Sequence, residues 1–330
     1  MGVNYMSEKV ELFNQNKLRI ALTNACNLSC FYCHNEGQKI GCKRQFLSYE
    51  YIKQMVEFII KNNVKVDFIN ITGGEPTLHK DLINIIDELK KLNCKIRLNT
   101  NATLLTKEKI DELKAHGVYS LKIGIDSIFT KQSKPNVLTN KASLDQILEN
   151  IKYASKIMGV VLNTVVTKFN YKDIDKLIQF TRDSGINRIK IIKLNDTDSR
   201  NLNLRDDIAD DFKTNQAESN WYYYIFTKYV TLATKTINNP HKGRTDLYFD
   251  NNFEIRFCDD ICTHGACGNM YTEINANGDI LICQRRNISA PVDFTKSYNE
   301  VATKIKSANS MMCNSLTKTY KLRDEKYNHI

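Results

Sequence analysis

The chain lacks any long hydrophobic run among its 330 residues. No stretch is apolar over the thickness of a bilayer, and residues 1–10 lack the apolar core of a secretory signal. There is also no internal repeat, low-complexity tract or Gly/Ser-rich linker. These absences predict a cytoplasmic protein without membrane partners. The length suits one large domain followed by a smaller one.

Cysteine, in contrast, is plentiful, with 10 residues in the chain. In a reducing compartment this number favours metal ligation over disulfides. Cys26, Cys30 and Cys33 follow a predicted buried strand with the spacing C-x3-C-x2-C. Three thiolates on one short loop can hold three irons of a four-iron cluster and leave the fourth iron open to a ligand. The alternative is a structural zinc site with His34 as the fourth ligand.

A second motif, Thr72-Gly73-Gly74-Glu75-Pro76, ends the next predicted strand. Its two glycines would let a ligand approach the backbone closely, and the Glu75 carboxylate could receive an ammonium group. Alone, such a segment is an ordinary tight turn. Its position after the cysteine loop favours a binding segment.

Together these motifs resemble those of the radical S-adenosylmethionine (SAM) superfamily, through the three cysteines, the aromatic Tyr32 and residues Gly73 to Pro76. The resemblance implies a 4Fe–4S cluster on the cysteines, with SAM chelating its open iron. It also implies reductive cleavage of SAM to a 5′-deoxyadenosyl radical, which abstracts a hydrogen atom from the substrate. The cofactor-binding residues expected on this basis are Tyr32, Thr72, Gly73, Gly74, Glu75, Pro76, Asn99, Asn101, Asp126 and Asn163.

Residues 17–194 alternate short apolar runs with amphipathic segments. The predicted strands are 17–23, 65–72, 95–101, 120–126, 160–166 and 188–194. The predicted helices are 48–61, 81–91, 107–116, 143–158 and 171–184. This alternation indicates βαβ units and a parallel sheet. Six strands are too few for a closed eight-stranded barrel, and the resemblance implies an α/β fold with a partial (β/α)6 TIM-like barrel. A further helix is predicted around 207–237.

The period-2 pattern of the strands predicts which residues face inward. In the third strand Ile96, Leu98 and Thr100 suit the face under the helices. The same reasoning places a polar set on the inner face: Arg19, Arg97, Asn99, Asn101, Lys122, Asp126, Asn163 and Lys190. Arg19 and Lys122 either pair with buried carboxylates or line a binding site, and the sequence favours neither interpretation. The candidate catalytic or substrate residues are Arg19, Lys190, Lys193 and Cys313.

A second cysteine group lies in the last third of the chain, where hairpin strands are predicted at 253–257, 271–275 and 280–282 around an Asn277-Gly278 turn. Its members are Cys258, Cys262, Cys267 and Cys283. Four cysteines suit either zinc or a second cluster. The segment from Cys267 to Cys283 resembles the twitch form of the SPASM domain, which implies an auxiliary 4Fe–4S cluster.

The predicted division is an arm at 1–16, a barrel at 17–245 and an auxiliary domain at 246–330. Cys94 is expected to be a packed residue.

The sequence leaves the substrate open. The formal net charge of +10 favours an anionic small molecule or nucleotide-like substrate, although a solvated lysine-rich surface would give the same charge. The nearest resemblance is to GTP 3′,8-cyclases of molybdenum cofactor synthesis. This chain departs from them by ending without Gly-Gly, by Thr263-His264-Gly265 after Cys262 and by Val161 in place of a lysine.

Two rival functions remain. One is modification of a peptide, for which the roughly sixteen residues before the first predicted strand leave no recognition module. The other is a non-enzymatic iron–sulfur electron carrier, which would not need the segment from Gly73 to Pro76. An enzyme of this kind would need a one-electron donor such as flavodoxin or ferredoxin. No base-reading motif suggests duplex nucleic acid as a partner.

Overall fold

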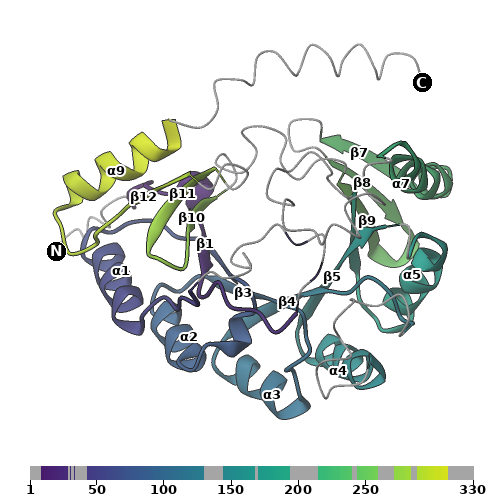
Figure 1. Cartoon of the computed structure of the whole chain (residues 1–330), viewed down its shortest axis with the longest axis horizontal. Helices are drawn as coiled ribbons and strands as arrows, with labels where there is room; N and C mark the ends of the chain where they lie inside the picture. Colours follow the sequence, from purple (N-terminus) through teal and green to yellow (C-terminus); the bar gives the residue numbers. More distant parts are fainter. Residues whose placement is uncertain are drawn as a thin grey trace, which may run out of the picture.

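A computed structural model describes residues 9–28, 30, 33, 43–129, 144–167, 170–193, 215–239, 244–258, 271–283 and 288–310. The described strands form one curved sheet of twelve strands in the order β12-β11-β10-β1-β2-β3-β4-β5-β6-β9-β8-β7 (Figure 1). The central part is parallel and each end is extended by antiparallel strands. This is the α/β, partial-barrel class predicted from the sequence.

The parallel strands are β1 (Lys17–Ala21), β2 (Phe68–Thr72), β3 (Lys95–Thr100), β4 (Val118–Gly124), β5 (Gly159–Val166), β6 (Arg188–Lys193), β9 (Phe253–Cys258) and β10 (Thr272–Ile274). The antiparallel strands are β7 (Lys235–Asn239), β8 (Arg244–Phe249), β11 (Asp279–Cys283) and β12 (Ile288–Pro291). The helices are α1 (Tyr49–Lys61), α2 (Leu82–Lys90), α3 (Lys107–Ala115), α4 (Leu144–Ile157), α5 (Ile174–Asp183), α7 (Asn215–Val230) and α9 (Tyr298–Ser310). Short 3-10 turns cover Asn14–Asn16, Pro76–Leu78, Tyr171–Asp173 and Asp250–Asn252.

Helices α1 to α5 cover the outer side of the sheet (Figure 1). Their starts follow local capping chemistry. The Ser48 hydroxyl accepts a hydrogen bond from the Tyr51 backbone N–H at 3.1 Å, and Thr106 does the same for Lys109. Each cap satisfies one of the backbone donors that a helix leaves unpaired at its start. Among the described residues no helix is both long and apolar enough to cross a membrane.

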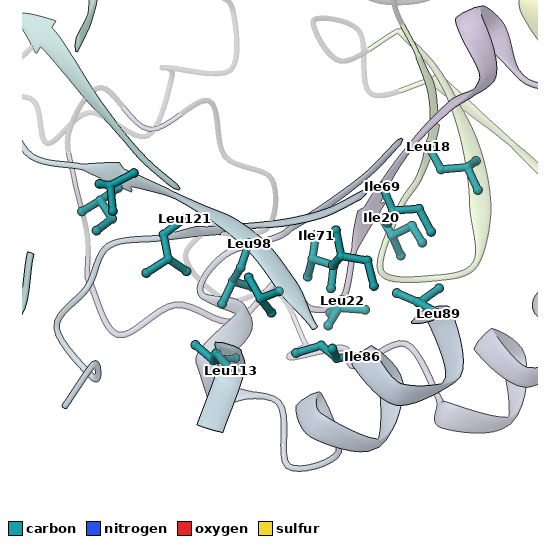
Figure 2. Packing of buried hydrophobic residues seen from close by; sticks show 14 of the residues in the cluster. Leu18, Ile20, Leu22, Ile69, Ile71, Ile86, Leu89, Leu98, Leu113 and Leu121 are labelled. Carbon is teal, nitrogen blue, oxygen red and sulfur yellow. The ribbon is translucent and has the colours of Figure 1, made fainter. Parts of the chain in front are cut away.

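The core lies between this outer face and the helices. Leu18, Ile20, Ile69, Ile71 and Leu98 are almost completely buried, and Figure 2 shows them beside Ile86 and Leu89 of α2 and Leu113 of α3. Burying one such side chain contributes about 1.5–3 kcal/mol. The apolar residues of alternate positions therefore attach the sheet to its helices, and the intervening positions are left for the inner face.

The predicted strands of residues 17–194 are found as β1 to β6, and the predicted helices as α1 to α5. The predicted helix at 207–237 is wrong in its last part, because α7 ends at Val230 and Lys235–Asn239 form β7. The Thr234 N–H and hydroxyl both donate to the Tyr248 carbonyl, at 2.9 Å, and start the pairing of β7 with β8. Residues 207–214 lie outside the described residues. Strands β7, β8 and β12 and helix α9 were not predicted.

The C-terminal extension, β10 to β12 with α9, attaches to β1 and α1. Strand β10 pairs in parallel with β1, and the Tyr51 hydroxyl of α1 donates to the Gly278 carbonyl at 2.7 Å. Phe58 of α1 stacks on Tyr298 of α9, with ring centroids 6.2 Å apart. The predicted Asn277-Gly278 turn is present, with Gly278 at a φ of +86°. The predicted domain boundary after residue 245 falls inside β8.

Candidate active site

The cysteine loop begins where β1 ends. The Leu22 N–H donates to the Thr72 carbonyl at 2.9 Å, and the Thr23 hydroxyl donates to the Gln45 carbonyl at 2.6 Å. The Cys33 N–H donates to the Cys30 carbonyl at 2.9 Å, so these two cysteines lie on one tight turn. Cys26, Cys30 and Cys33 each keep part of their surface accessible. Tyr32 and His34 lie outside the described residues.

Gly73 and Gly74 are required by the cysteine loop itself. A Cβ at Gly73 would lie 2.3 Å from the Thr23 carbonyl oxygen, and one at Gly74 would lie 2.1 Å from the Ala25 carbonyl oxygen. The Gly74 and Glu75 N–H groups donate to those same two oxygens, at 2.7 and 2.8 Å. The close approach that the sequence predicted for a ligand is made here by the backbone that leads into Cys26.

The Glu75 carboxylate is fully buried and already has four protein donors. Oε1 accepts from the Thr77 N–H (3.1 Å), the Thr77 hydroxyl (2.6 Å) and the Thr100 hydroxyl (2.8 Å), and Oε2 accepts from the Asn101 N–H at 2.7 Å. Oε2 accepts a single hydrogen bond among the described residues, and the expectation that this carboxylate receives an ammonium group stays a prediction. Glu75 also joins the end of β2 to the end of β3.

Asn101 connects this joint to a cysteine. Its Nδ2 lies 3.7 Å from the Cys26 Sγ, within hydrogen-bond distance for sulfur, and 2.9 Å from Asn27 Oδ1. The Asn27 Nδ2 in turn donates to the Thr103 hydroxyl at 2.8 Å. The Leu28 N–H also points to the Cys26 Sγ, at 3.4 Å. Donors placed around a cysteine sulfur stabilise its thiolate form, which is the form that ligates metal.

Thr72, Asp126 and Asn163 are found at or near strand ends. Thr72 is buried and its hydroxyl lies 3.5 Å from an Arg19 guanidinium nitrogen. Asp126 is buried, and its carboxylate accepts from the Val165 N–H at 3.1 Å, which ties β4 to β5. Asn163 lies on β5 between Gly124 and Lys190, and its Oδ1 is buried without a hydrogen-bond partner in the described part of the chain.

The inner face is polar, as the alternation predicted. Arg97 and Asn99 keep accessible surface, whereas Ile96 and Leu98 are buried between them. Arg19 and Lys122, for which pairing with a buried carboxylate and lining a binding site were both open, differ in the structure. Arg19 pairs with the buried Glu273 at 3.3 Å, whereas Lys122 makes no ion pair with any described residue.

A network of ion pairs occupies one side of this face. Asp246 pairs with Arg256 at 2.7 Å and with Arg244 at 3.0 Å, and Glu254 pairs with Arg188 and Arg256. Burial, followed by the positive charge of Arg188, lowers the pKa of Arg97 on β3. Charges on β3 and β6 therefore act on each other across the curved sheet.

The candidate Lys193 and the expected packed residue Cys94 both have structural contacts. The Lys193 ammonium lies over the Tyr223 ring of α7, 5.2 Å from its centroid. Tyr222 of the same helix is buried against Phe257, whereas Tyr224 is exposed. Cys94 packs against the core, and burial raises the pKa of its thiol to about 12.

The auxiliary cysteines are only partly described. Cys258 is buried at the end of β9, next to Ile192 of β6. Cys283 ends β11 at the other side of the strand order. Cys262, Cys267 and Cys313 lie outside the described residues. The four-cysteine ligand set remains a prediction.

The cysteine loop suits an iron–sulfur cluster by its chemistry. It offers three thiols at the carboxyl edge of the sheet and backbone and amide donors directed at the first of them. No three His, Cys, Asp or Glu side chains within the described ranges are grouped closely enough to hold one metal ion. The fit rests on the three cysteine thiols and on the backbone that leads to them. Gly73, Gly74 and Glu75, at the end of β2, hold that backbone in place.

Comparison with known proteins agrees with this site. Residues 20–181 match the family model of the radical SAM superfamily. A probable GTP 3′,8-cyclase of Sulfurisphaera tokodaii is 34% identical over 180 residues, 54% of this chain and 55% of that protein. One from Pyrococcus horikoshii is 39% identical over 152 residues, 46% of this chain and 47% of that protein. These matches span about half the length of the curated relatives.

Solved structures share the fold. Streptococcus suis SuiB superposes with a TM-score of 0.58 at 20% identity, covering 90% of this chain and 68% of SuiB. The native anSMEcpe structure with bound AdoMet gives a TM-score of 0.58 at 13% identity, covering 90% and 82%. Radical SAM enzymes use SAM and a 4Fe–4S cluster. Residues 20–181, about half of the chain, are therefore a radical SAM domain.

Proposed function

We propose that the chain cleaves SAM reductively and uses the resulting radical to abstract a hydrogen atom from an anionic small-molecule or nucleotide-like substrate. Cys26, Cys30 and Cys33 would hold the SAM-binding 4Fe–4S cluster. When bound and reduced, this cluster supplies the electron that cleaves SAM to methionine and a 5′-deoxyadenosyl radical. One observation carries the proposal. The backbone that leads into Cys26 is hydrogen-bonded to residues that follow β2, and the Cys26 sulfur to a residue that follows β3.

This chain's own residues would position the reactants. Glu75 and Asn101 hold the start of the cysteine loop in a fixed relation to β3. The Glu75 carboxylate, whose Oε2 accepts one protein hydrogen bond, and the peptide groups from Gly73 to Pro76 would contact SAM. Asn163 offers an amide oxygen on the same inner face that no described residue satisfies. The outer layer of helices keeps the apolar side of the strands away from water.

The test is formation of 5′-deoxyadenosine from SAM by the anaerobically reconstituted chain with dithionite. We expect Cys30→Ala to lower this activity by more than about a hundredfold, because even lost supporting contacts of metal ligands cost 10- to 100-fold. Cys94→Ala is the matched control, since Cys94 lies in the packed core, and it should retain activity. A native chain that forms no 5′-deoxyadenosine would favour the electron-carrier function and refute the proposal.

A second candidate is GTP 3′,8-cyclase activity, favoured by the relatives of that name. Against it stands Val161, which lies on β5 beside Lys122 where the cyclase pattern has a lysine. The same reaction with GTP distinguishes the cyclase from the proposed function, because only a cyclase forms the cyclised nucleotide.

Peptide modification has some support from the fold shared with SuiB, which has been crystallised with precursor peptide SuiA.

Three further assignments belong to the same proposal. Residues 246–330 would form the auxiliary domain with a second 4Fe–4S cluster on Cys258, Cys262, Cys267 and Cys283. The barrel would cover residues 17–245. The electron would come from an external donor such as flavodoxin or ferredoxin.

A further inference from the structure

The inner face carries positive charge that the described protein does not neutralise. Lys122 of β4 and Lys190 of β6 make no ion pair and no hydrogen bond with any described residue. The strand carboxylates nearby are already engaged: Glu273 with Arg19, Asp246 with Arg256 and Arg244, and Glu254 with Arg188. The two lysines therefore have no carboxylate partner within the described sheet.

The register of the strands brings these groups to one area. Lys122 pairs with Asn99 of β3 on one side and with Val161 of β5 on the other. Lys190 pairs with Asn163 of β5, two residues beyond Val161. Neighbouring strands lie about 4.8 Å apart and two residues along a strand span about 6.6 Å, so the Cα atoms of the two lysines are about 12 Å apart, within reach of a common ligand for two side chains of this length.

The electrostatics agree with this placement. Burial, followed by the positive charges of Lys190, Arg19 and Arg97, lowers the pKa of Lys122. Grouped like charges in a partly enclosed site oppose one another, and a bound anion relieves that repulsion. A surface lysine would have water for the same purpose, whereas Lys122 lies on the inner face and is only partly accessible.

A second, independent observation concerns neutral polar groups. The amide oxygens of Asn70 and Asn99 are buried and have no hydrogen-bond partner among the described residues. Buried polar groups without a partner are uncommon, and an amide oxygen is satisfied by a hydroxyl donor. Asn99 is the register partner of Lys122, so an unused acceptor lies beside an unpaired cation.

We propose that Lys122 and Lys190 bind a phosphate or carboxylate group of the substrate, and that a hydroxyl group of the same molecule donates to Asn99. This inference rests on the proposed function and narrows the substrate to a hydroxylated anion. The reacting carbon would lie between this anion and the carboxyl edge, where the cysteine loop begins.

The experiment measures binding to the reconstituted full chain by isothermal titration calorimetry, without reductant. The probes are ribose 5-phosphate, gluconate and uncharged ribose. We expect one charged probe to bind more tightly than ribose, and Lys122→Met to weaken that probe by at least about tenfold, the value of one charge-assisted hydrogen bond. Preference for ribose 5-phosphate identifies a phosphate, and preference for gluconate identifies a carboxylate.

Three variants make the result specific. Lys122→Arg keeps the charge and should retain most of the binding, and Lys190→Met gives a separate reading if Lys122→Met fails to fold. Lys114→Met, at an exposed position on α3, should bind as the native chain does. The proposal is overturned if neither charged probe binds more tightly than ribose, or if Lys114→Met and the two inner-face Met variants bind alike. The binding assay does not measure SAM cleavage. Failure of the proposed function would appear as absent 5′-deoxyadenosine, and failure of this proposal as absent binding of the charged probes.

Discussion

At the scale of single residues, the site depends on side chains that hold other side chains. Glu75 and Asn101 are named by the sequence motifs as cofactor-binding residues. Their contacts in the structure are mainly to protein: Glu75 to Thr77, Thr100 and Asn101, and Asn101 to Cys26 and Asn27. A motif residue can thus act by fixing a ligand residue, which sequence spacing alone does not distinguish from direct contact.

Asn101 gives a prediction at this scale. Asn101→Asp keeps the oxygen that accepts from the Thr103 N–H but removes the donor to the Cys26 Sγ and adds negative charge beside it. Hydrogen bonds to cluster sulfurs raise the reduction potential. We expect the potential of the reconstituted cluster to fall by on the order of tens of millivolts, because one hydrogen bond is worth about 1 kcal/mol and about 59 mV corresponds to tenfold for one electron.

An EPR-monitored redox titration measures this change without any turnover. Asn187→Asp, at an exposed loop position, is the control for the added charge and should leave the potential unchanged. An unchanged potential in Asn101→Asp would show that the amide has no influence on the cluster.

At the scale of elements, strand ends act together. The ends of β1, β2 and β3 are bonded through Leu22 to Thr72, through Gly74 to Thr23 and through Glu75 to Asn101. Adjacent parallel strands bring their carboxyl ends to one edge, so loops far apart in sequence form one site. The alternation of the strands predicted this edge correctly, but it did not predict which loop backbone would contact the glycines.

Gly74→Ala tests this contact between elements. The added Cβ would lie 2.1 Å from the Ala25 carbonyl oxygen, so the approach to Cys26 must shift. We expect a loss of stability of about 1–3 kcal/mol, as for overpacked sites. The affinity for the cluster should fall by about 10- to 100-fold. Iron content after desalting and the visible absorbance of the cluster measure the second effect.

Gly185→Ala separates cluster loss from general destabilisation. Gly185 has a φ of +69° and open space at its Cβ, so alanine there is strained without touching the cysteine loop. Its stability should fall while its iron content stays native. Equal iron content in the two variants would mean that Gly74 serves the fold alone.

At the scale of the whole molecule, the C-terminal third completes the sheet at both sides. Strand β9 extends it from β6, and β10 extends it from β1. This third of the chain supplies Glu273 to Arg19, Glu254 to Arg188 and Asp246 to Arg256, so it neutralises part of the inner face. The charge left on Lys122 and Lys190 is what remains after this pairing.

Iron content tests the organisation of the whole chain. If both cysteine groups carry 4Fe–4S clusters, the reconstituted chain should hold about eight irons, and simultaneous replacement of Cys258, Cys262 and Cys267 by Ala should leave about four. Iron assay and protein quantitation on the same samples give the ratio. A native value of about four, unchanged in the triple variant, would contradict the auxiliary cluster.

The sequence by itself determined the local features. Apolar alternation fixed β1 to β6 and their helices, because burial of every second residue is dictated by the pleat, and the cysteine spacing identified the superfamily. It failed at β7, where pairing with β8 overrode a helical pattern. Only the tertiary structure decided that Arg19 meets Glu273 and that Lys122 has no such partner. The reason is physical: charge pairing depends on distances between strands more than 200 residues apart along the chain, and no local pattern encodes those distances.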